Sequence, residues 1–130
     1  MIPEDRTIPS PPVNPENRAF FEAAAAGRLL IGRCRACGEP HYYPRRSCPF
    51  CASDRVEWVA ASGRGRIYSS SVMRRVPRPY AIAYVTLEEG PTMLTNLVDC
   101  DVDRLRIGDL VRLVFKTAEG GEAIPMFTPA

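Results

Sequence analysis

The most informative segment of this 130-residue sequence reads Cys34-Arg-Ala-Cys37-Gly-Glu-Pro-His-Tyr-Tyr-Pro-Arg-Arg-Ser-Cys48-Pro-Phe-Cys51. It holds two Cys-x-x-Cys pairs with ten residues between them. Two residues between paired cysteines let both sulfurs face one point, and two such pairs supply the four soft ligands of a tetrahedral Zn²⁺ site. We therefore predict a structural zinc site formed by Cys34, Cys37, Cys48 and Cys51.

Composition places the chain among ordinary globular proteins, as one domain or two very small units. Hydrophobic residues make up 45% of it and charged residues 25%. We find no apolar run near the ~20 residues needed to cross a bilayer and no signal-peptide pattern, so we expect a cytoplasmic protein without a membrane partner. In a reducing compartment, paired cysteines favour metal over disulfides, and the odd fifth cysteine, Cys100, agrees with this.

Charge is distributed unevenly along the chain, although the net charge is only +2. Residues 28–78 contain eleven arginines and three acidic residues, whereas residues 79–130 contain four basic and eight acidic ones. A basic middle segment attracts phosphate-bearing ligands, either nucleic acid or a phosphorylated cofactor. The alternative is a solvated, salt-bridged surface.

The N-terminal part is predicted to be an arm followed by a helix. Residues 1–14 contain four prolines, and we expect a flexible, extended or disordered arm. Asn14 followed by Pro15 is a typical helix start, and Gly27 suits a left-handed helix stop. Phe20 and Phe21 give this short helix an apolar face, which must pack on the chain's own core or on a partner.

The remaining sequence predicts short strands in two groups. Segments 29–33 and 56–60 flank the cysteine pairs, and residues 15–60 together resemble a helix followed by a rubredoxin-like zinc ribbon. From residue 61 onward, strands are predicted at 66–73, 80–87, 92–98, 110–115 and 123–127. Five short strands separated by Gly-rich turns indicate a five-stranded OB-fold barrel over residues 61–130. The predicted fold class is therefore mainly β.

The sequence offers no catalytic set, and we predict no catalytic residue. His41 is the only histidine, lies between the cysteine pairs and is expected to be a surface or packing residue. Four cysteines saturate a tetrahedral zinc ion, so no position stays open for substrate. Cys100 lies between Asp99 and Asp101, whose carboxylates disfavour a thiolate.

Several short motifs in a fixed order carry a resemblance to a known family. They are Phe21-Glu-Ala, Gly27-Arg-Leu, Cys34-Arg-Ala-Cys37-Gly, Pro44-Arg-Arg, Cys48-Pro-Phe-Cys51, Trp58, Ser62-Gly-Arg-Gly-Arg-Ile-Tyr-Ser, Pro79-Tyr, Arg106-Ile-Gly-Asp-Leu-Val and Ile124-Pro-Met-Phe. Over residues 15–130 the chain resembles the acyl-CoA-associated zinc-ribbon/OB-fold family, long catalogued as a domain of unknown function.

This resemblance implies an accessory subunit that is not catalytic by itself. Members of the family form complexes with thiolase-like proteins, which act as thiolases, acyltransferases or retro-aldolases on acyl-CoA thioesters. A heterotetramer with two copies of each subunit is implied, because thiolase-like proteins usually dimerise. The barrel is proposed in this family to accept acyl-CoA rather than nucleic acid.

On this resemblance the candidate acyl-CoA contacts are Arg64, Arg66, Arg74, Arg75 and Tyr80. Guanidinium forks match phosphate oxygens, and Tyr80, with Tyr68 and Tyr84, would flank an acyl or pantetheine path. A solvated rim and ordinary core packing are the alternative interpretations of these side chains. Two other functions stay open: an OB-fold protein that binds single-stranded nucleic acid, which the acidic C-terminal third disfavours, and a purely structural scaffold.

Overall fold

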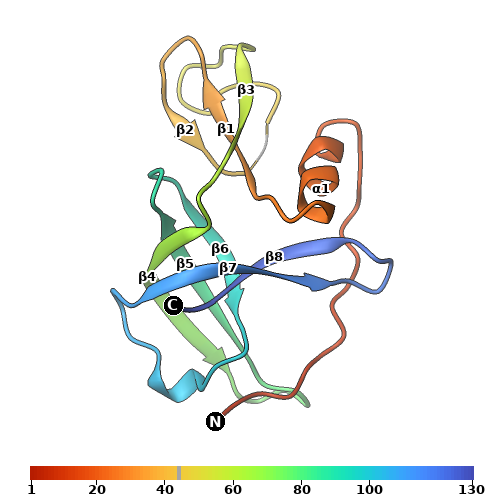
Figure 1. Cartoon of the computed structure of the whole chain (residues 1–130), viewed down its shortest axis with the longest axis vertical. Helices are drawn as coiled ribbons and strands as arrows, with labels where there is room; N and C mark the ends of the chain where they lie inside the picture. The colour runs from red at the N-terminus through yellow and green to blue at the C-terminus, as the bar shows by residue number, and fades with distance from the viewer. Residues whose placement is uncertain (44) are drawn as a thin grey trace.

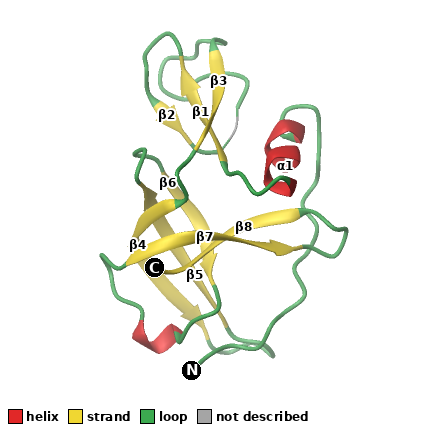
Figure 2. Cartoon of the chain, in the orientation of Figure 1, coloured by secondary structure: helices red, strands yellow, loops and turns green. Residues whose placement is uncertain are grey.

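Two β structures lie one above the other, with a single helix beside their junction (Figure 1). The computed structural model describes residues 1–43 and 45–130. The smaller sheet has the order β2-β1-β3, and five further strands close into a barrel in the order β4-β5-β6-β8-β7 (Figure 2). The predicted mainly β fold class, with helix, zinc ribbon and five-stranded barrel, is confirmed.

The elements have the following bounds: α1 Arg18–Ala25, β1 Leu30–Cys34, β2 Pro40–His41, β3 Val56–Ala60, β4 Arg64–Met73, β5 Tyr80–Leu87, β6 Thr92–Leu97, the 3₁₀ turn η1 Val102–Arg104, β7 Leu110–Thr117 and β8 Ala123–Pro129. The strand predictions agree with these bounds to within two residues at most ends. The two-residue strand β2 was not predicted, because the sequence around it has no strand periodicity.

Helix α1 begins later than the sequence predicts, at Arg18 instead of Pro15. Asn14 caps the preceding turn, since its side-chain oxygen accepts from the N–H groups of Glu16 and Asn17, both at 3.0 Å. The helix ends at Ala25, and Gly27, the predicted left-handed stop, follows with φ +82°. There the N–H of Gly27 donates to Ala24 and the N–H of Arg28 to Ala23, the hydrogen-bond pattern of a Schellman cap.

The barrel is closed by antiparallel pairs and one parallel pair, between β6 and β8. Strand β5 alternates buried and outward positions, which is why its sequence reads as a half-buried strand. Strand β4 changes register between Ile67 and Ser69, and this irregularity leaves the intervening Tyr68 exposed. Closure gives each barrel strand two neighbours, so a partner recognises mainly the side chains of the barrel rather than extending the sheet.

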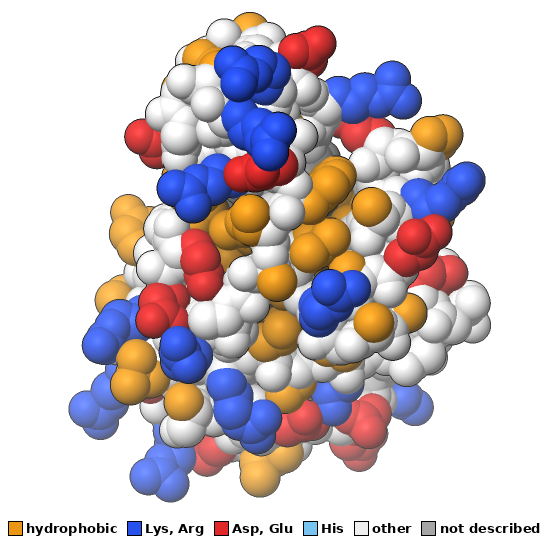
Figure 3. Space-filling view, turned by 45° about the horizontal axis from the view of Figure 1, so that its top comes forward, with side chains coloured by type: hydrophobic (Ala, Val, Ile, Leu, Met, Phe, Trp, Pro, Cys, Tyr) orange, Lys and Arg blue, Asp and Glu red, His pale blue; other side chains and the backbone are white. Residues whose placement is uncertain are grey.

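One apolar core connects the helix, the ribbon and the barrel. Phe20 of α1 and Ile31 of β1 belong to the same cluster of buried residues as Val85 and Phe127 of the barrel. The ring of Phe20 also lies 5.1 Å from that of Tyr43, centroid to centroid. Where the ribbon meets the barrel, hydrophobic side chains reach the surface in a hollow, while charges of both signs alternate elsewhere on the visible face (Figure 3).

The N-terminal arm runs extended along the barrel and has no helix or strand of its own. The carbonyl of Ile8 accepts from the N–H of Glu119 at 2.9 Å, and the carbonyl of Asp5 accepts from Arg78 at 2.7 Å. These contacts place the arm on the β7–β8 and β4–β5 loops. No helix of the described residues is long and apolar enough to cross a membrane.

Candidate functional site

The four predicted zinc ligands converge, and their sulfur atoms all lie within 4.8 Å of one another. Cys34 Sγ is 3.6 Å from Cys51 Sγ, and Cys37 Sγ is 3.7 Å from Cys48 Sγ. Four sulfurs at about 2.3 Å from a tetrahedral zinc ion lie about 3.8 Å apart. The residues therefore fit Zn²⁺, and none of the four tetrahedral positions stays open for substrate.

Backbone N–H groups are directed at the sulfur atoms, as in zinc knuckles. Ala36 and Cys37 donate to Cys34 Sγ at 3.3 and 3.4 Å, and Phe50 donates to Cys48 Sγ at 3.4 Å. The N–H of Cys37 is the largest of the causes that lower the pKa of the Cys34 thiol to about 6. The backbone hydrogen bonds to Cys37 and Cys51 lower their pKa values, but burial and the neighbouring thiols outweigh these bonds and raise both pKa values. Because a metal ligand must be a thiolate, these two cysteines release their protons when zinc binds.

His41 packs inside the ribbon and does not contribute a ligand to the four-sulfur cluster. Its side chain is buried, and neither ring nitrogen has a hydrogen-bond partner among the described residues. It lies opposite Gly32 on the neighbouring strand, where an added Cβ would lie only 2.2 Å from His41 Nε2. Burial lowers the pKa of His41 and keeps the imidazole neutral. The prediction of a packing residue is consistent with this position.

Cys100 has the properties of an unreactive thiol. It is partly buried, and burial raises its pKa first, with further contributions from Asp99 and Asp101. A raised pKa lowers the fraction of thiolate, which is the nucleophilic form.

The five candidate acyl-CoA residues do not lie together. Arg64 and Arg66 are at the beginning of β4, whereas Arg74, Arg75 and Tyr80 surround the β4–β5 turn at its other end. Eight residues of extended chain separate Arg66 from Arg74, roughly 26 Å. One CoA phosphate group cannot contact both clusters.

The cluster at the beginning of β4 contains a third arginine, which the sequence did not indicate. Arg112 of β7 lies directly opposite Arg64. Arg64 forms an ion pair with Glu88 at 2.7 Å, but Arg66 and Arg112 have no carboxylate within salt-bridge distance among the described residues. Like charges directly opposite in a sheet are unfavourable, so this position favours an anionic partner. The place of Arg112 in this cluster follows only from the register of β4 and β7, which the sequence does not show.

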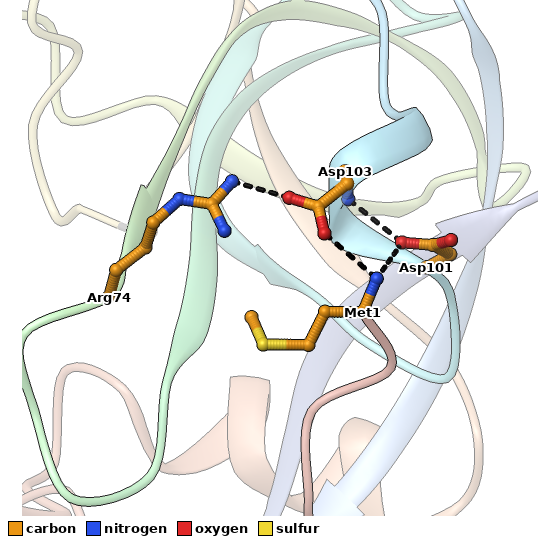
Figure 4. Close-up of polar contacts among 4 residues, drawn as sticks. All are labelled: Met1, Arg74, Asp101 and Asp103. Carbon is orange, nitrogen blue, oxygen red and sulfur yellow. Dashed lines mark hydrogen bonds and ion pairs between the residues drawn. The ribbon is translucent and has the colours of Figure 1, made fainter.

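The other cluster is tied to the arm (Figure 4). Arg74 forms an ion pair with Asp103 at 2.5 Å, and Asp103 also accepts from the amine of Met1 at 2.8 Å. Asp101 is the second partner of this amine, and these contacts lower the pKa values of both carboxyl groups.

Tyr80 lies beneath the arm. The guanidinium of Arg6 is 3.9 Å from the centre of the Tyr80 ring. Beside them is a cavity of about 250 Å³ between the arm and the barrel, which Lys116 and Met126 also line. Lys116 forms an ion pair with Asp99 at 2.8 Å.

Two family models match consecutive parts of the chain. The ChsH2 rubredoxin-like zinc ribbon domain matches residues 21–57, and the ChsH2 C-terminal OB-fold domain matches residues 58–116. A DUF35 domain-containing scaffold protein of Methanothermobacter thermautotrophicus is 40% identical over 72% of this chain and 77% of its own length. The chain belongs to the ChsH2 (DUF35) family.

A solved structure of this family extends the similarity to nearly the whole fold. The structure titled "Ltp2-ChsH2(DUF35) aldolase" has a TM-score of 0.82 and 38% identity, covering 92% of this chain and 98% of that one. The recognition of the family from the sequence motifs is therefore confirmed.

Two further relatives are named as subunits of enzymes. A probable enoyl-CoA hydratase alpha subunit of Thermomonospora curvata is 39% identical over 94% of this chain, which spans only 40% of that relative. A benzoylsuccinyl-CoA thiolase subunit of Thauera aromatica is 29% identical over 84% of this chain and 81% of its own length. Each of these four similar proteins is named as a scaffold, a subunit or a component of an enzyme.

Proposed function

We propose that this chain is a non-catalytic accessory subunit that binds a thiolase-like partner and helps to bind or orient its acyl-CoA thioester. The observation that carries the proposal is the match over 98% of the chain in the aldolase structure. The relative named as a subunit of a thiolase supports the same role. The chemistry of the described residues agrees, because the four cysteines fill a zinc site, the only histidine is buried and the fifth thiol has a raised pKa.

For acyl-CoA, the proposal favours the cluster beneath the arm. Tyr80 and the cavity of about 250 Å³ offer a partly apolar place for the acyl or pantetheine part. Arg75 is exposed in the β4–β5 turn that precedes Tyr80 and would contact phosphate oxygens, while Arg74 is already paired with Asp103. The second cluster, Arg64 and Arg66, lies over a shallow groove and is the alternative contact.

The proposed complex is a heterotetramer with two copies of each subunit. Co-expression with a thiolase-like protein of the same organism, followed by light scattering on the purified complex, gives the stoichiometry. Assays of the partner on a panel of CoA thioesters, with and without this chain, test whether its activity needs the accessory subunit. A complex whose activity per mole of soluble partner is unchanged by this chain would indicate a scaffold only.

The acyl-CoA contacts are tested with two variants of the complex. Arg75→Ala with Tyr80→Ala is expected to raise the Kd for the thioester about tenfold, whereas Arg64→Ala is the comparison at the other end of β4. The reverse ranking would move the site to the second cluster.

Single-stranded nucleic acid binding is the competing function. The arm lies over the β4–β5 and β7–β8 loops, which correspond to loops that OB folds use for oligonucleotides. Fluorescence anisotropy with a labelled oligonucleotide tests this function directly. Salt-sensitive binding without any effect of acyl-CoA would favour it over the accessory role.

A further inference from the structure

Large hydrophobic side chains are exposed on neighbouring segments of the barrel. They are Tyr68 at 67% exposure, Tyr84 at 47%, Leu94 at 55%, Ile107 at 74% and Leu110 at 54%. In a monomeric protein such side chains are usually scattered, and a contiguous group is typical of an interaction surface.

Strand register makes the group contiguous. Tyr84 of β5 lies directly opposite Leu94 of β6, and on its other side it pairs with Ser69 of β4. Tyr68 precedes Ser69 at the register shift and is exposed. Tyr68, Tyr84 and Leu94 are therefore three large exposed side chains on the adjacent strands β4, β5 and β6.

The last two members continue the group onto the segment before β7. Leu110 pairs with Arg66 of β4, and the N–H of Gly108 donates to the carbonyl of Ile67 at 2.8 Å. Ile107 therefore comes next to β4 at the level of Ile67 and Tyr68. We call these five residues the barrel face: Tyr68, Tyr84, Leu94, Ile107 and Leu110. The barrel face curves around the barrel from β6 over β5 and β4 to the beginning of β7.

The barrel face is large enough to matter energetically. The exposed fractions of its five residues together correspond to about three fully exposed large side chains. At about 150–200 Å² for each side chain, the exposed area is on the order of 500 Å². A standard interface buries about 800 Å² on each partner, so these five residues alone would supply more than half of it.

The arm does not cover the barrel face, because its hydrogen bonds go to the β4–β5 and β7–β8 loops and to η1. Two candidates are left to cover the barrel face, a second copy of this chain and a different protein. The charges at the border of the barrel face decide between these two. Arg66 pairs directly with Leu110, and Arg112 follows two residues later; neither guanidinium has a carboxylate partner among the described residues. Twofold pairing with a second copy would bring these arginines onto one interface without neutralising them. A different protein with carboxylates around an apolar centre would both bury the hydrophobic side chains of the barrel face and neutralise Arg66 and Arg112.

We propose that the barrel face is the docking surface for the thiolase-like partner. This assignment rests on the proposed function and adds the place of contact. Tyr84 and Leu94 form the apolar centre, and Arg66 with Arg112 form the cationic border that faces acidic side chains of the partner. Tyr80 and Tyr84 are four residues apart on β5, about 13 Å, so the proposed acyl-CoA cavity lies near the border of the interface.

The experiment measures the Kd between the full chain and a separately purified thiolase-like protein of the same organism. Tyr84→Ser with Leu94→Ser is expected to raise the Kd at least 100-fold, because large apolar side chains at an interface centre dominate binding. Ile2→Ser with Val76→Ser is the matched control, since both side chains are exposed and lie outside the barrel face. Arg66→Glu with Arg112→Glu is expected to raise the Kd at least tenfold and to slow association.

The outcomes separate the two proposals. Wild-type chain that binds no thiolase-like protein would overturn the proposed function together with this assignment. Binding by the Tyr84→Ser, Leu94→Ser variant within threefold of wild type would overturn the barrel face alone. Light scattering on the isolated chain should give a monomer, and a dimer that this variant abolishes would assign the face to a second copy. Unchanged circular dichroism and Tm show that the variants are folded.

Discussion

Replacing Cys48 by serine tests whether zinc holds the ribbon together. Cys48 is buried, and its Sγ atom lies 3.7 Å from the Sγ atom of Cys37, so the substitution removes one of four converging ligands. A serine hydroxyl is a poor zinc ligand at neutral pH, because zinc requires a deprotonated group. We expect the variant to be purified with little or no zinc.

The size of the effect follows from how little else stabilises the ribbon. Among the described residues of 30–60, the buried side chains are Ile31, His41 and two of the zinc ligands. Burial of one aliphatic side chain stabilises by about 2–3 kcal/mol, whereas structural zinc in small modules contributes on the order of 10 kcal/mol or more. Loss of the metal therefore unfolds residues 30–60. We predict that the barrel stays folded, because most residues of the shared buried cluster lie in its own strands.

Trp58 provides the assay. It is the only tryptophan, lies on β3 of the ribbon and is 36% exposed, so its emission should shift to the red when the ribbon unfolds. Zinc content is measured on the same sample, and circular dichroism follows the barrel. Cys100→Ser is the control, because this thiol lies outside the cluster. Full zinc content and unchanged Trp58 emission in Cys48→Ser would refute the four-cysteine site.

Three further predictions concern buried or crowded groups. Burial lowers the pKa of His41 in the folded chain, so the neutral imidazole contributes its full stability above the unfolded-state pKa of about 6.5. This stability is lost as the pH falls below that value. Urea unfolding at several pH values should show the loss, and His41→Gln should abolish the pH dependence. Gly32→Ala places a Cβ 2.2 Å from His41 Nε2 and should cost about 1–3 kcal/mol of unfolding free energy, but less in a His41→Ala background. Iodoacetamide at pH 8 should alkylate Cys100 more slowly in the folded chain than in urea, by mass spectrometry, because folding raises its pKa; equal rates would contradict this.

Local chemistry was enough to predict most of the fold. The Cys-x-x-Cys pairs gave the metal ligands, Gly27 gave the helix end, and alternation in residues 80–87 gave a strand with the same bounds as β5. These signals act over a few residues and need no knowledge of tertiary contacts. The start of α1 was misplaced because Asn14 caps a turn that precedes the helix.

Contacts between distant segments could not be read in the same way. Arg112 comes to lie opposite Arg64, and Arg6 comes to lie over Tyr80, only through the register of the barrel and the path of the arm. For the same reason, Tyr68 and Tyr84 looked like possible core positions on alternating strands, but both point outward.

Ion pairs between distant segments change what the charge pattern of the sequence suggests about the partner. Along the sequence, a basic middle precedes an acidic end, which suggests a surface of one sign. In the barrel these segments are neighbours, and Arg64 pairs with Glu88 while Arg74 pairs with Asp103. Among the described residues, three of the eleven arginines of residues 28–78 form such ion pairs, so the basic charge of this segment is reduced only in part. Arg66 and Arg112, which have no ion pair with a carboxylate among the described residues, lie beside exposed tyrosine and leucine side chains. A mixed surface of this kind is better suited to a folded protein partner than to a nucleic-acid backbone, which requires a continuous track of positive charge.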